Sequence, residues 1–262
     1  MPHVITQIDA FTSKPFAGNP AGVCVMDKAA DERWMQNVAA EMNLSETAYL
    51  YPHPQGYNLR WFTPAAEVKL CGHATLASAH LLYQDGYVPR DRGISFFTKS
   101  GELKARLDGD WIELDFPASR VTTAPPPEGL LDALGVAAVY VGKSNFDYLV
   151  EFESEDRLRA ITPDIGRIAG LPVRGVIVTA KSSGEYDFVS RFFAPAVGVN
   201  EDPVTGSAHC ALGPYWQSKL GKSSFVAYQA SKRGGVVKVR VAGDRAFLSG
   251  QAVTVLKCEL VA

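Results

Sequence analysis

Short apolar runs separated by turn residues dominate the first half of the chain. Residues 31–42 differ, because apolar side chains recur there every four positions, which is typical of one helix face. A second helix is expected at 74–83, where Asp85 and Gly86 end the apolar run. The remaining runs are short and rich in β-branched and aromatic residues, as strands are. Strands or extended segments are therefore expected at 4–11, 21–26, 48–51, 58–64, 94–98, 102–106 and 111–116.

The second half of the chain repeats this order of elements. A proline-rich stretch at 124–129 lies near the middle and is expected to be an interdomain linker or a loop at the rim. The six residues from Arg60 and the six from Arg191 share the pattern Arg-aromatic-Phe-x-Pro-Ala, half a chain length apart. The alternative is that two generic strand–turn–helix units match by chance.

The alignment after this pattern has two registers. Without a gap, Cys71 pairs with Asp202, whereas a three-residue insertion pairs Gly72 with Gly206. In either register the chain divides into an N-terminal half, residues 1–118, and a C-terminal half, residues 128–250. The last strand, at about 251–262, is expected to pack onto the N-terminal half.

Composition and charge limit the class of protein. The chain has 262 residues, 47% of them hydrophobic and 21% charged, as in ordinary globular proteins. The formal net charge of -2 leaves no basic excess for nucleic acid. No signal peptide and no membrane span is apparent, so a cytoplasmic protein without a membrane partner is expected. The four cysteines are scattered, which disfavours a zinc site and a disulfide framework, and no metal is expected.

Two glycine-containing helix starts, at Gly72 and Gly206, are candidates for ligand binding. A helix start offers free backbone N–H groups and the positive end of the helix dipole. If the halves are related by a pseudo-twofold axis, the two starts flank one cleft and can bind a carboxylate or an oxyanion, with Ser207 adding a hydroxyl. The alternative is that these glycines only let helices pack closely.

Three ionisable residues are candidates for proton transfer. Glu46 lies between the first helix and the next strand, and its counterpart in the repeat lies near Gly175, which has no side chain. His73 follows Gly72 and could shuttle protons near neutral pH. Asp202 precedes the second helix start. Taken singly, each could equally be a helix cap, a surface residue or a hydrogen-bonded structural residue.

Several blocks of sequence occur in one order along almost the whole chain. They read IDAF and FAGNPAGV at 8–11 and 16–23, NLSETA at 43–48, RWFTP and CGHAT at 60–64 and 71–75, and FAP and EDPVTGSA at 193–195 and 201–208. Together they resemble the phenazine-biosynthesis isomerase-like family, whose relatives include diaminopimelate epimerase.

The resemblance implies an α+β fold with two pseudo-symmetric halves, each a β-barrel-like sheet around a central helix. It also implies an active site in the cleft between the halves, no organic cofactor, no metal, and a homodimer.

The resemblance further implies roles for particular residues. The family's catalytic glutamate, histidine and aspartate match Glu46, His73 and Asp202. Epimerase relatives use two opposed cysteines, and Cys71 matches the first of them, but Asp202 occupies the partner position. This departure favours isomerisation with one carboxylate. Substrate-binding positions are expected at Ser45, Gly72, Gly206, Ser207 and Asn19.

The hypothesis is a cofactor-independent isomerase that moves a proton on a small carboxylate-bearing substrate by acid/base catalysis. One alternative is a non-catalytic protein that binds small carboxylates on the same scaffold. Another is a racemase or dehydratase of hydroxyproline type, which needs a thiol pair.

Overall fold

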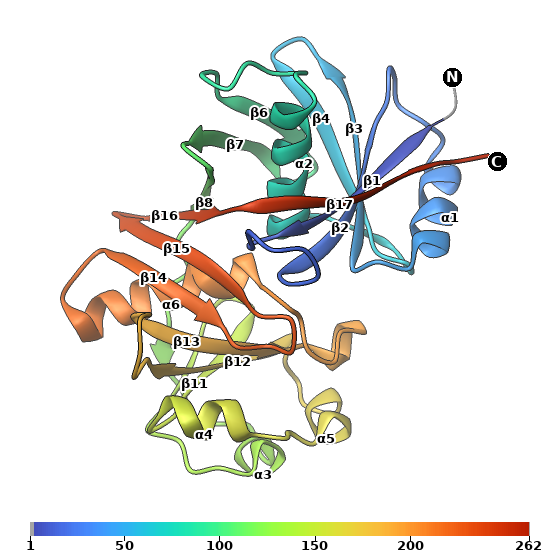
Figure 1. The fold of residues 1–262 in the computed structure, drawn as a ribbon. Helices are drawn as coiled ribbons and strands as arrows, with labels where there is room; N and C mark the ends of the chain where they lie inside the picture. The colour runs from blue at the N-terminus through green and yellow to red at the C-terminus, as the bar shows by residue number, and fades with distance from the viewer. Residues whose placement is uncertain (1–2, 262) are drawn as a thin grey trace. The chain divides into compact units, whose positions relative to one another are not determined.

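A computed structural model describes residues 3–261; residues 1, 2 and 262, at the outer ends of the predicted halves, lie outside the described part. The chain forms two compact units (Figure 1). The first comprises the chain up to Asp115 together with the segment from Ser249, and the second is Phe116–Leu248. The proline-rich stretch at 124–129 lies inside the second unit, so it is a loop of that unit rather than a linker.

The first unit is a strongly curved sheet with two helices. Its strands pair in the order β17–β1–β2–β3–β4–β6–β7–β8, and the short β5 pairs with β4. The helices are α1 (Glu32–Met42) and α2 (Gly72–Gln84). The strands are β1 (Val4–Ala10), β2 (Asn19–Val25), β3 (Glu46–His53), β4 (Gly56–Phe62), β5 (Glu67–Val68), β6 (Ile94–Thr98), β7 (Gly101–Asp108), β8 (Trp111–Pro117) and β17 (Ala252–Glu259).

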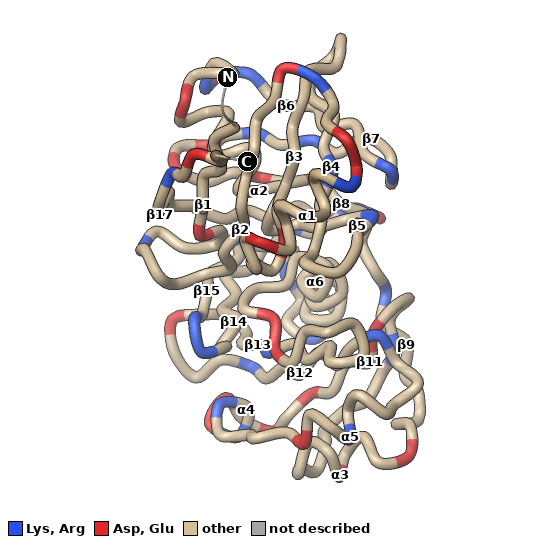
Figure 2. The backbone as a smooth tube through the Cα atoms, turned by 90° about the vertical axis from the view of Figure 1, so that its right-hand side faces the viewer, with Lys and Arg blue, Asp and Glu red and all other residues tan. Residues whose placement is uncertain are grey.

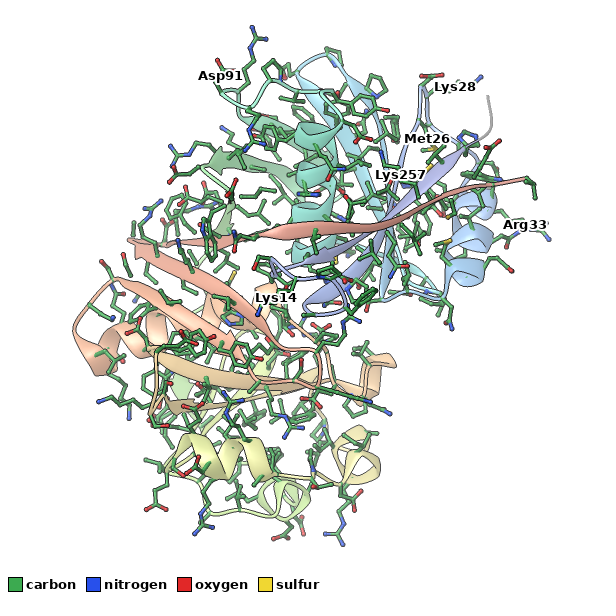
Figure 3. The ribbon with its side chains drawn as sticks, viewed as in Figure 1. Lys14, Met26, Lys28, Arg33, Asp91 and Lys257 are labelled. Carbon is green, nitrogen blue, oxygen red and sulfur yellow. The ribbon has the colours of Figure 1, made fainter. Side chains whose placement is uncertain are left out.

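Helix α2 is the centre of the first unit. It packs against β1, β2, β3 and β17, and its residues from His73 to Ala79 are all buried. A helix that is apolar all round is stable only when it is enclosed, and the curved sheet encloses this one. Lys257 of β17 (labelled in Figure 3) donates to Asp85 at the end of α2, at 2.8 Å, and joins the last strand to the helix.

The second unit has the same plan around α6 (Gly206–Leu220), which is largely buried and packs against β15. Its strands are β9 (Thr122–Thr123), β10 (Tyr140–Lys143), β11 (Asp147–Glu151), β12 (Gly175–Lys181), β13 (Phe188–Phe193), β14 (Ser224–Gln229), β15 (Gly235–Ala242) and β16 (Arg245–Gly250). The short helices are α3 (Leu130–Leu134), α4 (Glu155–Ala160), α5 (Ile165–Ala169) and the 3₁₀ turn η1 (Pro195–Val197). The apolar side chains of α3, α4 and α5 form one core with β11, β12 and β13.

The two units repeat one strand topology. Successive pairs in β1–β2–β3–β4–β6–β7 are antiparallel, parallel, antiparallel, parallel and antiparallel. The series β10–β11–β12–β13–β14–β15 has the same sequence of pairings. In both units the central helix comes between the fourth and fifth strands of the series. The predicted α+β fold with two pseudo-symmetric halves is therefore confirmed.

The helix starts decide the register of the repeat. Each arginine of the shared pattern donates two hydrogen bonds to a glutamate that follows it in the sequence. Glu67 follows Arg60 by seven positions, whereas Glu201 follows Arg191 by ten. The three additional residues therefore lie in the turn that contains η1. Because α2 and α6 begin at Gly72 and Gly206, the ungapped alignment of the sequence is wrong. The residue before Gly206, Thr205, is the counterpart of Cys71.

Basic and acidic residues are interspersed along both units (Figure 2). Among the described residues, no helix has the length and apolar character that crossing a membrane requires.

Candidate active site

The start of α2 brings together the residues that the sequence predicts in the first unit. Glu46 Oε2 lies 3.1 Å from Nε2 of His73, and both side chains are largely buried. On the other side of the ring, Asn19 Nδ2 lies 3.2 Å from His73 Nδ1, and Ser45 donates its hydroxyl to Oδ1 of Asn19. The imidazole is thus held between a carboxylate and an amide, directly after Gly72, the first residue of the helix.

Turns and strand pairing of the backbone position these side chains. Helix α1 ends at Asn43, whose left-handed conformation (φ 50°) turns the chain toward β3, and Glu46 is the first residue of that strand. Gly18 has φ +63°, and a Cβ there would lie 2.2 Å from the carbonyl oxygen of Ala10. Only glycine fits this position, which sets Asn19 at the start of β2. Parallel pairing of β2 with β3 then places both strand starts beside α2.

The environment of His73 stabilises its charged form. Burial alone would lower the pKa of His73, but Cys71 and Glu46 together raise this pKa well above its ordinary value. The Glu46 carboxylate faces Nε2 of the ring at 3.1 Å, and the Cys71 sulfur lies 3.5 Å from Nδ1. The amide of Asn19 suits both forms of the ring, because a rotation of the amide presents either Nδ2 to a bare Nδ1 or Oδ1 to a protonated one.

NMR titration of the histidine ring signals tests this environment. His73 is expected to titrate above pH 6.5, and Glu46→Gln is expected to shift its titration to lower pH. His209 is the internal control, because burial lowers its pKa to about 4 and keeps it neutral from pH 6 to 9. The folded pKa of His73 is raised, so the ion pair contributes most stability below pH 6.5. This contribution is lost as the pH rises through the folded pKa. A His73 titration that is identical in both proteins would contradict the pairing.

The cysteines do not form the thiol pair of a two-cysteine racemase. Burial and the charge of Glu46 raise the pKa of Cys71 to about 11, so its thiol is protonated at neutral pH. Its counterpart in the second unit is Thr205, and burial raises the pKa of the nearby Cys210 to about 12. A racemase of that type needs two opposed groups that accept and donate a proton in turn.

If the protein moves a proton on its substrate, as the sequence predicts, Cys71→Ser is expected to keep the rate within about threefold, because the thiol is neither ionised nor paired with a second one. The measurement is deuterium incorporation into substrate by proton NMR, with Cys24→Ser, a buried cysteine of β2, as the matched control. A hundredfold lower rate of deuterium incorporation in Cys71→Ser, but not in Cys24→Ser, would support the two-thiol interpretation.

Three groups at the start of α2 are of types that bind metals. Ligand atoms of Glu46, Cys71 and His73 lie within 4.8 Å of one another. The imidazole, however, directs different nitrogens at its two neighbours, with Nδ1 3.5 Å from the Cys71 sulfur and Nε2 toward Glu46. To bind one metal ion together, a single nitrogen of the imidazole, a deprotonated Cys71 and the Glu46 carboxylate would all have to face the same point. In the observed arrangement, Nδ1 of the ring faces Asn19 and Cys71, and Nε2 faces the Glu46 carboxylate.

The start of α6 gathers the predicted residues of the second unit. Thr205 precedes the helix, and its hydroxyl donates to the carboxylate of Asp202. Gln229 donates to the Asp202 carbonyl oxygen at 2.8 Å and accepts the N–H of Thr205 at 2.9 Å. Gly206 and Ser207 are the first residues of the helix. The segment that carries Asp202 is therefore fixed against β14 before the helix begins.

A basic residue that the sequence analysis did not single out lies at this second helix start. Arg174 donates through Nε to Oδ1 of Asp147 at 2.8 Å and through Nη2 to the other carboxylate oxygen. The same Nη2 lies 3.2 Å from Oγ of Ser207. Arg174 directly precedes Gly175, the counterpart of Glu46, so the alignment of the two halves was the one signal that could have found it.

Comparisons with known proteins agree with this fold. A model of the family described as phenazine biosynthesis-like protein matches residues 8–258. The chain belongs to this family. An uncharacterized isomerase of Halalkalibacterium halodurans is 58% identical over 256 residues, which cover 97% of each chain. The crystal structure of a phenazine biosynthesis family protein from Enterococcus faecalis superposes with a TM-score of 0.96, at 39% identity and full coverage of both chains.

A more distant structure shows how far the fold extends. A hydroxyproline epimerase from Agrobacterium vitis is 12% identical and superposes with a TM-score of 0.66, covering 99% of this chain and 94% of that one. At this identity the likeness concerns the fold alone. The family match and the isomerase relatives confirm the predicted isomerase class, and they name no substrate.

Proposed function

We propose that this family member is a cofactor-independent isomerase that moves a proton on a small substrate bearing a carboxylate. The observation that carries the proposal is the Glu46–His73 pair, 3.1 Å apart and largely buried at the start of a helix. A carboxylate that is held by a charged imidazole and is shielded from water is suited to general acid/base catalysis.

In the proposed reaction Glu46 takes a proton from a carbon atom of the substrate. The C–H bond breaks, its electron pair passes into the conjugated system of the substrate, and the proton moves to the Glu46 carboxylate. Glu46 then returns a proton at a different carbon, so the product is an isomer and no redox partner is consumed. His73, as an imidazolium, compensates charge on Glu46 when the carboxylate is free of the proton.

Each helix start is proposed to bind an anionic part of a substrate. Backbone N–H groups at Gly72, and those at Gly206 with the hydroxyl of Ser207, would bind a carboxylate and stabilise negative charge as it develops. Asn19 and Ser45 would orient His73, and Asp202 would relay a proton at the second helix start.

The experiment is proton NMR in D₂O with a panel of small cyclic and amino carboxylates. Deuterium that appears at one carbon with the wild-type protein, and at a far lower rate with Glu46→Gln, supports the proposal and identifies the substrate class. Saturable binding of a carboxylate without any exchange, at an affinity that does not depend on Glu46, would contradict it in favour of a binding protein.

A further inference from the structure

The second unit has a basic side chain where the first unit has its acidic one. Antiparallel pairing sets Thr47 opposite Phe62 in the first unit and Val176 opposite Phe193 in the second, and these two phenylalanines are equivalent in the shared pattern. Gly175 and Glu46 are the residues directly before Val176 and Thr47. Gly175 is therefore the counterpart of Glu46, and Arg174 is the counterpart of Ser45. A Cβ at Gly175 would lie 2.5 Å from Phe192 Cζ, so this ring excludes a side chain there.

The guanidinium of Arg174 is held in position, but not all of its N–H groups donate hydrogen bonds within the protein. Its partner Asp147 is only 2% exposed, whereas the Arg174 side chain is 37% exposed. The Asp147 backbone and the Ser144 hydroxyl bond each other in a tight turn, with the Asp147 N–H 3.0 Å from Ser144 Oγ. The buried Asp147 carboxylate thus orients the partly exposed Arg174 guanidinium. The Nη1 atom of this guanidinium donates a hydrogen bond to none of the described residues.

Two further features surround the open edge of this guanidinium. The first is the start of α6, where Ser207 already accepts from Arg174 and where the first amides of a helix lack partners within the helix. The second is a pair of aromatic rings, because the guanidinium carbon lies 5.2 Å from the centre of the Phe146 ring and 5.8 Å from that of Phe192. Phe146 is 60% exposed, so its ring presents an apolar surface beside the guanidinium.

We infer that Arg174 is a substrate-binding residue that recognises the carboxylate of a flat, apolar ring. The carboxylate accepts hydrogen bonds from Nη1 of Arg174 and from the start of α6, and the ring lies against Phe146. Arginine suits this role because its planar fork matches a carboxylate and stays charged at every working pH. The inference rests on the proposed function in one respect, since it names the class of carboxylate on which the proposed isomerase would act.

Benzoate tests this assignment, with benzamide as the uncharged probe of the same shape. Binding is followed by NMR on ¹⁵N-labelled protein, through the amide signals of Gly206 and Ser207, at constant ionic strength. We expect benzoate to shift these signals with saturation and benzamide not to. In Arg174→Gln the dissociation constant of benzoate is expected to rise at least ~10-fold, since a charge-assisted pair is lost, and Arg174→Lys should fall between the two.

Two variants separate recognition from folding. Arg174→Gln alone leaves the buried Asp147 carboxylate unpaired, so the double variant Asp147→Asn/Arg174→Gln removes both charges and should fold while still binding benzoate weakly. The matched control is Arg167→Gln on α5, where an exposed arginine pairs with Asp164 at 3.4 Å, and its benzoate binding should equal that of the wild type.

The outcomes distinguish this inference from the proposed function. Equal benzoate affinity in the wild type and the double variant would overturn the role of Arg174, as would no response in the wild type up to about 50 mM, an affinity too weak for a charge-assisted site. Proton exchange that depends on Glu46 can still be observed in either case. Conversely, benzoate binding that depends on Arg174, without proton exchange on any carboxylate, would contradict the isomerase and leave the carboxylate site standing.

Discussion

Glu46→Gln is expected to lower deuterium incorporation into substrate by ~10³-fold, because the amide cannot accept the carbon-bound proton. The substitution keeps the size and shape of the side chain, so the amide can occupy the present position of the carboxylate, 3.1 Å from His73 Nε2. Binding should therefore change less than turnover, with KM within a few-fold of the wild type and the loss confined to kcat. The measurement is the initial rate of exchange in D₂O with the substrate that the carboxylate panel selects.

Two further variants make this prediction specific. Glu46→Asp retains the carboxylate but withdraws it by one methylene, so an intermediate rate is expected. Glu41→Gln, on the exposed side of α1, removes a glutamate of the same unit and should leave the rate unchanged. Thermal unfolding of all three variants shows whether a lost rate reflects lost structure. Turnover by Glu46→Gln at the wild-type rate would exclude Glu46 as the group that moves the proton.

The first helix start was largely predictable from sequence, for a physical reason. Glu46 and His73 lie within short blocks of defined composition, and each is fixed by local structure. The αL turn at Asn43 comes directly before β3, and Gly72 comes directly before the ring. Local signals of this kind are readable without knowing which strands pair. The fold class was implied by the resemblance to the family, and the repeated order of elements along the chain is consistent with it.

The arginine at the second helix start was not predictable in this way. Arg174 has no motif around it, and its partner Asp147 lies 27 positions earlier, on a strand that pairs in parallel with β12. The sequence places the counterpart of Glu46 near Gly175, but it does not show that the side chain of the preceding arginine reaches Asp147. The alignment of Cys71 with Asp202 failed for a related reason, because the three additional residues lie in a turn and leave no periodic signal. Pairings over long sequence distances depend on the fold itself.

The duplicated arginine–glutamate pair provides the second prediction, which concerns stability. Arg191 donates to both carboxylate oxygens of Glu201, at 2.7 and 3.0 Å, and through Nη1 to the carbonyl oxygen of Ile161 at 2.9 Å. It therefore ties β13 both to the turn before α6 and to the segment that follows α4. Arg191→Met fills similar space but leaves a largely buried carboxylate and a carbonyl without their donor. We expect the free energy of unfolding to fall by ~3 kcal/mol, which is the cost of removing one partner of a buried ion pair.

Urea unfolding measures this loss, and two variants show where it comes from. In the double variant Arg191→Met/Glu201→Leu both charges are replaced by apolar groups, so much of the stability should return, because the penalty belongs to the unpaired carboxylate. Arg167→Met removes an exposed arginine whose pair spans 3.4 Å, and such a pair contributes less than about 0.5 kcal/mol. Equal losses in Arg191→Met and Arg167→Met would mean that the repeated pattern does not stabilise the second unit. A large loss in Arg191→Met alone explains why an arginine, an aromatic residue and a phenylalanine recur before both central helices: they hold the turn from which each helix begins.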